Sequence, residues 1–332
     1  MNPISRIKLV VFALSIVASL QAQEEQKNYP GKVSGKIYSN FNYSLNADDR
    51  STAFELDRAY FGYEKQISEH FFANVKLDIG SPDDVSVYNK LRRYAYFKNA
   101  GLTYKNGKLT AWAGLFDMQQ FKLQEKFWGY RYLYKTFMDA YRIGPSADLG
   151  TGISYAFSDK ISSDLIISNG EGYSSPQRDE TFKTGWGLTL VPIPELTLRT
   201  YYSVFTSEIP QMTVSGFIGY HGTNFRLAGE YIYQHNYQFN QNQNRYGYSV
   251  YSTYEFSEKW EIFLRYDQVY SNILGDATEP WNLADDGSAL ITGVQFSPIK
   301  NIRFSLDYQD WIEYAGNGAA DRILYLHLEV NF

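Results

Sequence analysis

Apolar and polar residues alternate with a period of two along most of this chain. The clearest case is its last ten residues, where alternate positions form an apolar face (Leu324, Leu326, Leu328, Val330, Phe332) and a polar face (Tyr325, His327, Glu329, Asn331). This period predicts a strand with one face in an apolar medium and the other in a polar medium. The apolar face continues to the chain terminus, where strands of soluble proteins usually fray.

The same alternation recurs in segments of about 10 residues, the length that a tilted strand needs to cross a bilayer. The most legible segments are 33–45, 109–115, 196–204, 225–233 and 302–309. The alternation is faint near 94–104 and 161–168. Each segment alone is a weak signal, and their repetition without a linker or a composition break predicts one continuous β-domain.

The connections between these segments alternate in length. Tight turns are expected at 65–70, 105–107, 158–160, 192–195, 221–224, 257–259 and 297–300. Longer polar loops are expected at 46–52, 81–92, 117–147, 169–181, 206–211, 235–244, 271–286 and 313–320. Seven turns and eight loops predict sixteen strands in an antiparallel barrel, with fourteen or eighteen as alternatives, and an even number returns both termini to one side.

The N-terminal residues 1–22 have the pattern of an export signal. Arg6 and Lys8 precede an apolar run that ends in the small-residue sequence Ser19-Leu20-Gln21-Ala22. We expect cleavage after Ala22, which would leave residues 23–332 as a single domain. No later stretch approaches 18 continuous apolar residues, so the sequence predicts no transmembrane helix.

Composition favours a barrel over a secreted or periplasmic soluble domain. The chain has 30 Tyr, 22 Phe and 6 Trp but no Cys, so disulfides cannot stabilise it. Closing a barrel pairs every backbone group, and abundant tyrosine suits the interfaces between hydrocarbon and water. The mean hydropathy of −0.39 fits a barrel whose loops and interior are wet.

The expected size has a functional consequence. Barrels of about 16–18 strands are too wide for side chains to fill, and they leave an aqueous channel. Residues 23–32 are too few for a folded plug, so the long loop 117–147 is the candidate for narrowing the bore. The sequence therefore predicts a diffusion pore.

Several motifs resemble the porin family that includes the phosphate-selective porins O and P. They are Phe54-Glu55-Leu56-Asp57-Arg58-Ala59-Tyr60-Phe61-Gly62, Gly114-Leu115-Phe116-Asp117, Phe127-Trp128-Gly129-Tyr130-Arg131, Ser146-Ala147-Asp148-Leu149-Gly150 and Asn169-Gly170-Glu171-Gly172-Tyr173. The resemblance implies that residues 118–147 fold into the lumen and form the constriction. It also implies a homotrimer, and a terminal Phe332 that the barrel-assembly machinery reads as its signal.

The charge of that loop suggests which solutes it favours. Its charged residues are the candidates for the pore constriction: Lys122, Lys126, Arg131, Lys135 and Arg142, with Glu125 and Asp139. They sum to +3, whereas the chain without its leader has 29 basic and 36 acidic residues, a net charge of −7. A basic element in an acidic protein creates a local field that attracts anions. The alternative is a solvated external loop without selectivity.

Strand positions assigned to the lumen carry both signs of charge, which predicts only a mild anion preference. The basic candidates for the pore wall are Arg58, Arg199, Arg226, Arg265 and Arg303. Arg58 is also consistent with a structural arginine paired to a carboxylate on a neighbouring strand. Asp57 is expected on the opposite face unless a bulge intervenes.

Signals for catalysis, metals or nucleic acid are weak. The four histidines lack metal-ligand spacing, and no G-x-S-x-G, P-loop or H-E-x-x-H motif occurs. A pI near 5.5 disfavours nucleic acid. No enzyme activity, cofactor or metal is therefore expected. Three alternatives stay open: a saccharide-preferring pore with stacking aromatics (Trp128, Tyr130, Tyr132, Tyr134, Trp281), a structural barrel without conductance, and an outer-membrane lipase.

Overall fold

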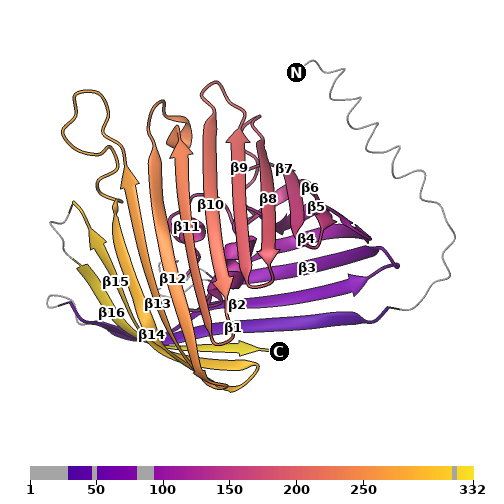
Figure 1. The fold of residues 1–332 in the computed structure, drawn as a ribbon, viewed down its shortest axis with the longest axis horizontal. Coiled ribbons are helices and arrows are strands. Elements are labelled where there is room, and N and C mark those ends of the chain that lie inside the picture. Colours follow the sequence, from indigo (N-terminus) through magenta and orange to yellow (C-terminus); the bar gives the residue numbers. More distant parts are fainter. Residues whose placement is uncertain (1–28, 47–50, 81–92, 316–319) are drawn as a thin grey trace.

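The computed structural model describes residues 29–46, 51–80, 93–315 and 320–332 and shows a closed antiparallel barrel (Figure 1). Its sixteen strands are β1 (Gly31–Ser44), β2 (Thr52–Gln66), β3 (Phe71–Gly80), β4 (Tyr94–Asn106), β5 (Leu109–Asp117), β6 (Ala147–Ser158), β7 (Ile161–Ser168), β8 (Lys183–Ile193), β9 (Leu196–Phe205), β10 (Gln211–His221), β11 (Phe225–His235), β12 (Arg245–Ser257), β13 (Trp260–Ser271), β14 (Gly287–Ile299), β15 (Ile302–Glu313) and β16 (Ala320–Asn331).

Every strand pairs with its neighbours in sequence, and β1 pairs with β16 to close the barrel. The prediction of sixteen strands is confirmed, including the two with faint alternation, β4 and β7. The export signal expected at 1–22 and the loop expected at 81–92 lie outside the described residues. Within the described ranges, no helix has the length and apolar character needed to cross a bilayer.

The two faces of the wall differ as the period of two predicts. On β16, Leu326 points outward and is 50% exposed, whereas His327 points inward and is 3% exposed. The same contrast holds around the barrel, because exposed aliphatic and aromatic residues form the outside and most buried polar residues face inward. An apolar exterior around a polar interior suits a barrel that stands in lipid.

Two irregularities change which side chains face the lumen. The pairing of β1 with β2 shifts between Tyr38 and Ser39, so that Asp57 becomes an extra residue. Asp57 accepts a hydrogen bond from the inward-facing Asn40 at 2.7 Å, while Arg58 bonds the inward-facing Asp78 at 3.1 Å. The bulge therefore turns both Asp57 and Arg58 inward, which departs from simple alternation.

A second shift lies between β3 and β4. Lys76 pairs with Asn99 and Leu77 pairs with Phe97, which leaves Lys98 as the extra residue. This bulge explains why the alternation near 94–104 is faint, since one added residue reverses the phase of the pattern.

The C-terminal residue completes the seam between β1 and β16. The amide of Gly35 donates to the carbonyl of Phe332 at 2.7 Å, and the amide of Phe332 donates back at 3.0 Å. The ring of Phe332 covers Gly35 so closely that a Cβ there would lie 2.3 Å from it. Phe332 therefore packs on the seam where only glycine leaves it room.

Candidate functional site

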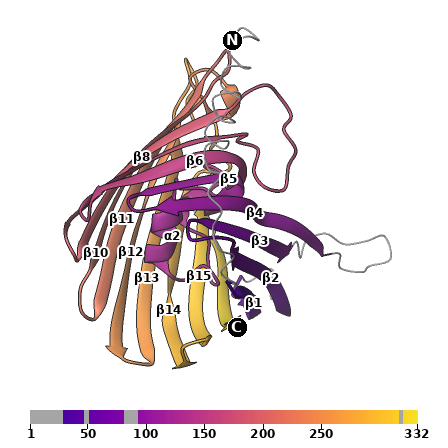
Figure 2. The same cartoon turned by 90° about the vertical axis from the view of Figure 1, so that its right-hand side faces the viewer.

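The longest connection between described strands, residues 118–146, lies against the inner wall of the barrel. It contains α2 (Lys122–Trp128) and α3 (Phe137–Ala140), and Figure 2 shows α2 within the ring of strands. The residues that flank the segment, Asp117 and Ala147, are direct partners in the β5–β6 ladder. The segment therefore leaves the wall and returns to it at one point.

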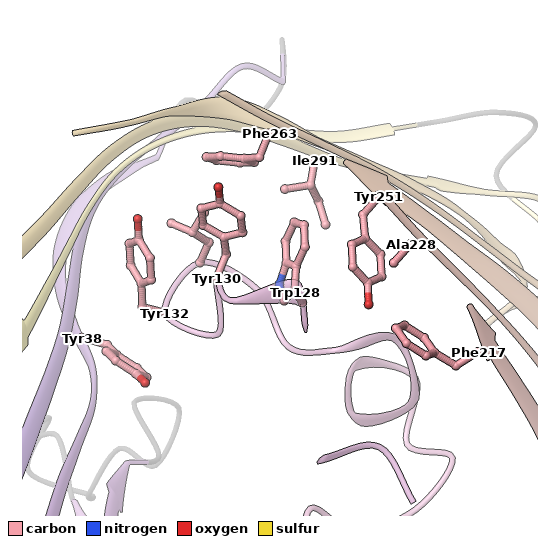
Figure 3. Packing of buried hydrophobic residues seen from close by; sticks show 10 residues of the cluster. Tyr38, Trp128, Tyr130, Tyr132, Phe217, Ala228, Tyr251, Phe263 and Ile291 are labelled. Carbon is pink, nitrogen blue, oxygen red and sulfur yellow. The ribbon is translucent and has the colours of Figure 1, made fainter. Parts of the chain in front are cut away.

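Aromatic packing holds the first half of this segment against strands β10–β14. Trp128 and Tyr130 are each 1% exposed and contact Tyr251 and Phe263 of the wall (Figure 3). Inward-facing Ile291 belongs to the same cluster. Burying one such side chain contributes roughly 1.5–3 kcal/mol. This contact explains why part of the barrel interior is apolar.

The second half of the segment packs in the same way on neighbouring strands. Phe137 and Met138 of α3 are fully buried in one cluster with Ile232 of β11 and Val269 of β13. Tyr141 lies against Trp311 of β15 and donates to the carboxylate of Asp267. The segment is thereby attached to the wall along its length.

Wall arginines then bond the backbone of the segment. Five of them donate to its carbonyl groups: Arg199 to Gln119 at 2.8 Å, Arg226 to Phe127 at 3.3 Å, Arg303 to Gly129 at 3.1 Å, Arg265 to Lys135 at 2.7 Å, and Arg245 to Tyr141 at 2.8 Å. Carbonyl groups that irregular structure leaves unpaired are costly to bury without such donors. These bonds satisfy carbonyl groups that the two short helices of the segment leave without a backbone partner.

Two of the arginines predicted for the pore wall are buried attachments. Arg199 forms two bonds to Asp164, at 2.7 and 3.0 Å. Arg265 is fully buried, forms two bonds to Asp267 and stacks on the ring of Trp128. Their charges are compensated at the interface between segment and wall, away from open water.

The other three predicted wall arginines border cavities. Arg58 lines a cavity on the side of the long loops and pairs with Asp78 at 3.1 Å. Arg226 and Arg303 line a cavity on the side of the short turns. They pair with Glu261 at 3.4 Å and with Glu329 at 3.2 Å, respectively. Each of these three arginines can contact a solute, but its carboxylate partner offsets part of its positive charge.

The charged residues of the segment divide into two groups. Arg131 pairs with both of its acidic residues, Asp139 at 3.4 Å and Glu125 at 4.0 Å. The other four cations are exposed and have no carboxylate within 4.0 Å among the described residues: Lys122, Lys126, Lys135 and Arg142. The positive charge of the segment is therefore carried by these four residues.

One of these cations is affected by its position. Loss of hydration lowers the pKa of Lys135; the positive charge of Arg131 also lowers it, while Asp139 opposes the shift. The charge of Lys135 is therefore lost at a lower pH than that of a hydrated lysine.

Two of the water-accessible cavities beside the segment adjoin one another. The outer cavity, about 700 Å³, lies beside the loops at 170–175 and 237–238. The inner cavity, about 560 Å³, reaches the short turn at Lys300 and Asn301. Arg131 and Ser146 line both cavities, which places the junction between them at these residues.

Basic residues outnumber acidic residues in both cavities. The outer cavity is lined by four basic residues (Arg58, Arg131, Lys135, Arg142) and two acidic residues (Asp139, Glu171). The inner cavity is lined by seven basic residues (Lys36, Lys98, Lys122, Lys126, Arg131, Lys300, Arg303) and three acidic residues (Asp117, Glu125, Glu329). Sequence reasoning missed Lys98, because the bulge hides its inward direction.

Sugar stacking, histidine chemistry and metal binding are the other possibilities that the sequence raises. Trp128, Tyr130 and Tyr132 are buried in the packing of the segment, so their faces are closed to a sugar. Buried His327 contacts Asp307 at 2.8 Å. In the described part of the chain, no three His, Cys, Asp or Glu residues are grouped as metal ligands.

Solved structures share this architecture. Salmonella typhi OmpF, in complex with daunomycin, aligns with a TM-score of 0.69 over 93% of this chain and 100% of that chain at 14% identity. The outer membrane channel DcaP of Acinetobacter baumannii aligns with a TM-score of 0.67 over 94% and 100% at 12% identity. The fold is that of outer-membrane porins. A trimer form of OmpT, an outer membrane protein of Vibrio cholerae, aligns with a TM-score of 0.62 over 92% and 100% at 11% identity.

At these identities the similarity concerns the fold. No family model matches the chain, and no curated protein matches its sequence.

Proposed function

We propose that this protein is a porin of the bacterial outer membrane through which small hydrophilic solutes diffuse passively. The carrying observation is the pair of adjoining cavities inside the closed barrel, which meet at Arg131 and Ser146 beside the segment 118–146. Such a path needs no moving part and no catalytic group. The width of the bore is set by how much of it the segment fills.

The pore prefers anions, and the preference is mild. Exposed Lys122, Lys126, Lys135 and Arg142 place uncompensated positive charge on both sides of the junction. Low-dielectric walls strengthen this field, and salt weakens it. Most wall arginines are paired with carboxylates, which limits the selectivity. Phosphate is one candidate solute, suggested by the motifs that resemble phosphate-selective porins.

Location and assembly follow from the same proposal. The chain is exported through its leader 1–22 and inserts as the single barrel domain 23–332. The trimer form of the Vibrio cholerae neighbour supports a homotrimer. The barrel-assembly machinery and the surrounding lipid are its other partners.

Single-channel recording of the refolded protein in a planar bilayer tests the proposal. We expect steady conductance and, under a salt gradient, a reversal potential that favours chloride over potassium. A potassium-selective conductance would contradict the anion preference and keep the pore. A silent barrel would contradict the porin and favour a structural role.

Liposome swelling separates a general pore from a saccharide-preferring one. Swelling rates that fall with the size of graded sugars agree with a general pore. Faster swelling with an oligosaccharide than with a smaller sugar would support the alternative.

Deleting Phe332 is expected to lower the yield of folded barrel in the membrane severalfold while export stays intact, because the assembly signal is lost. Membrane fractionation and heat-dependent gel mobility measure both quantities.

Gly35→Val keeps Phe332 but places a side chain in the space that its ring occupies. Gly216→Val on β10 is the matched control, because a Cβ at Gly216 meets nothing within 4 Å. Normal barrel yield without Phe332 would refute the signal.

A further inference from the structure

Lys98 differs from the other basic residues near the junction of the two cavities. It is the extra residue of the β3–β4 bulge, it lines the inner cavity, and it is 6% exposed. Long ammonium side chains are rarely buried to this extent unless they are paired. The groups that stabilise the buried ammonium of Lys98 therefore need to be identified.

Aromatic rings and a hydroxyl hold the ammonium group of Lys98. Its Nζ lies 5.4 Å from the ring centre of Tyr60 and 5.6 Å from that of Tyr173. It also donates to the hydroxyl oxygen of Ser146 at 3.2 Å. Cation–π contacts stabilise an ammonium group without cancelling its net charge. Among the described residues, no carboxylate lies within 4.0 Å of Lys98, although its charge acts at longer range on the carboxylate of Asp117, as do those of Lys76 and Lys122.

Neighbouring cations are compensated. Arg58 pairs with Asp78, and Arg131 pairs with Glu125 and Asp139. A further basic residue, Lys76, lies 3.9 Å from Asp117, an acidic residue that lines the inner cavity.

The balance of charge at the junction therefore depends on one residue. Arg58 and Arg131 together oppose three carboxylates, those of Asp78, Glu125 and Asp139. Lys98 brings this group to neutrality, and without it the narrow region carries a net negative charge. The unpaired cations of the segment line the two cavities: Lys122 and Lys126 line the inner cavity together with Lys98, and Lys135 and Arg142 line the outer cavity.

We propose that Lys98 sets the ion selectivity of the pore, and that the site it forms with Ser146 and Arg131 takes small singly charged anions such as halides or monocarboxylates. This inference rests on the proposed pore function. Within this neutral group, the ammonium of Lys98 creates a local positive field that attracts a monovalent anion without holding it, which permits conduction. It is too little to desolvate and bind a divalent phosphate.

Lys98→Gln is the decisive variant, because it removes the charge and keeps an unbranched polar side chain that is one atom shorter. The chloride-to-potassium permeability ratio, taken from the reversal potential, is expected to fall by about threefold. Lys98→Arg is expected to keep the wild-type ratio. Lys160→Gln, in the exposed turn between β6 and β7, removes one charge away from both cavities and serves as the matched control.

The outcomes separate this inference from the proposed function. A silent wild-type protein would refute the pore itself. A conducting Lys98→Gln variant with the wild-type ratio would refute the role of Lys98 and keep the pore. Heat-dependent gel mobility shows whether the Gln variant folds, and if it does not, loss of selectivity in folded Lys98→Arg would equally refute a role based on charge.

Phosphate tests the class of solute. Current carried by phosphate is expected to rise linearly with its concentration at pH 8, where the divalent form prevails. Saturation at low concentration would show a binding site for the divalent anion and overturn the monovalent assignment.

Discussion

Excising residues 119–145 and joining Met118 to Ser146 through an Asn-Gly turn is expected to raise single-channel conductance several-fold. The segment fills the interior beside strands β10–β15, and its removal leaves the open bore of a sixteen-stranded barrel. A short turn can replace it, because Asp117 and Ala147 are already paired and Met118 donates to Ser146 at 3.0 Å. Recording in a planar bilayer at high salt, where charge effects are screened, measures the change.

A charge control distinguishes width from electrostatics. The double variant Lys122→Gln, Lys126→Gln keeps the segment and removes two exposed cations. Its high-salt conductance is expected to match the wild type, while its anion preference falls. If the excised variant conducted no more than the wild type, the segment would not be the narrowing element.

Arg265→Ala is expected to release the segment from the wall. The substitution leaves Asp267 buried without its partner, and it removes the bond to the Lys135 carbonyl and the stack on Trp128. Breaking a buried ion pair from one side costs about 3–5 kcal/mol. Limited trypsin digestion of the refolded barrel is expected to cut the variant in the segment, at residues such as Lys126 and Lys135, while the wild type stays protected.

Removing both charges is the matched control for this variant. Arg265→Met with Asp267→Leu leaves no buried charge unpaired, so the segment is expected to stay protected for longer than in Arg265→Ala. Wild-type protection of Arg265→Ala would show that aromatic packing alone holds the segment. Increased open-channel current noise in Arg265→Ala would provide an independent sign of its release.

Sequence patterning determined the barrel in considerable detail. Strands that alternate apolar and polar residues and are long enough to cross a bilayer form a barrel, with the apolar face toward lipid and the polar face toward the lumen. Tight turns and long loops alternate because successive connections of an antiparallel barrel lie at opposite ends, with the short turns at one end and the long loops at the other. The sixteen strands and the inward face of β16 followed from these local rules.

Only the tertiary structure decided what each lumen residue does. Arg199, Arg265 and Arg58 look alike in sequence, yet two of them attach the internal segment and one borders a cavity. Their roles depend on partners from 20 to 130 residues away, such as Asp164, Lys135 and Asp78, and periodicity carries no information at that range.

The bulges set a similar limit. One extra residue turned Asp57 inward and another did the same for Lys98, and a bulge leaves no signature beyond a break in the alternation. The aromatic residues of the segment were ambiguous in another way. From the sequence, Trp128 and Tyr130 could either stack on a sugar or pack on the barrel wall. The sequence by itself determined a barrel and a long basic loop, because those features follow from local pattern and composition, whereas the position of that loop inside the barrel was implied only by the family resemblance. The three-dimensional pairing of charges decided which positive groups remain for a solute, because compensation depends on distances of a few ångströms between residues far apart in the chain.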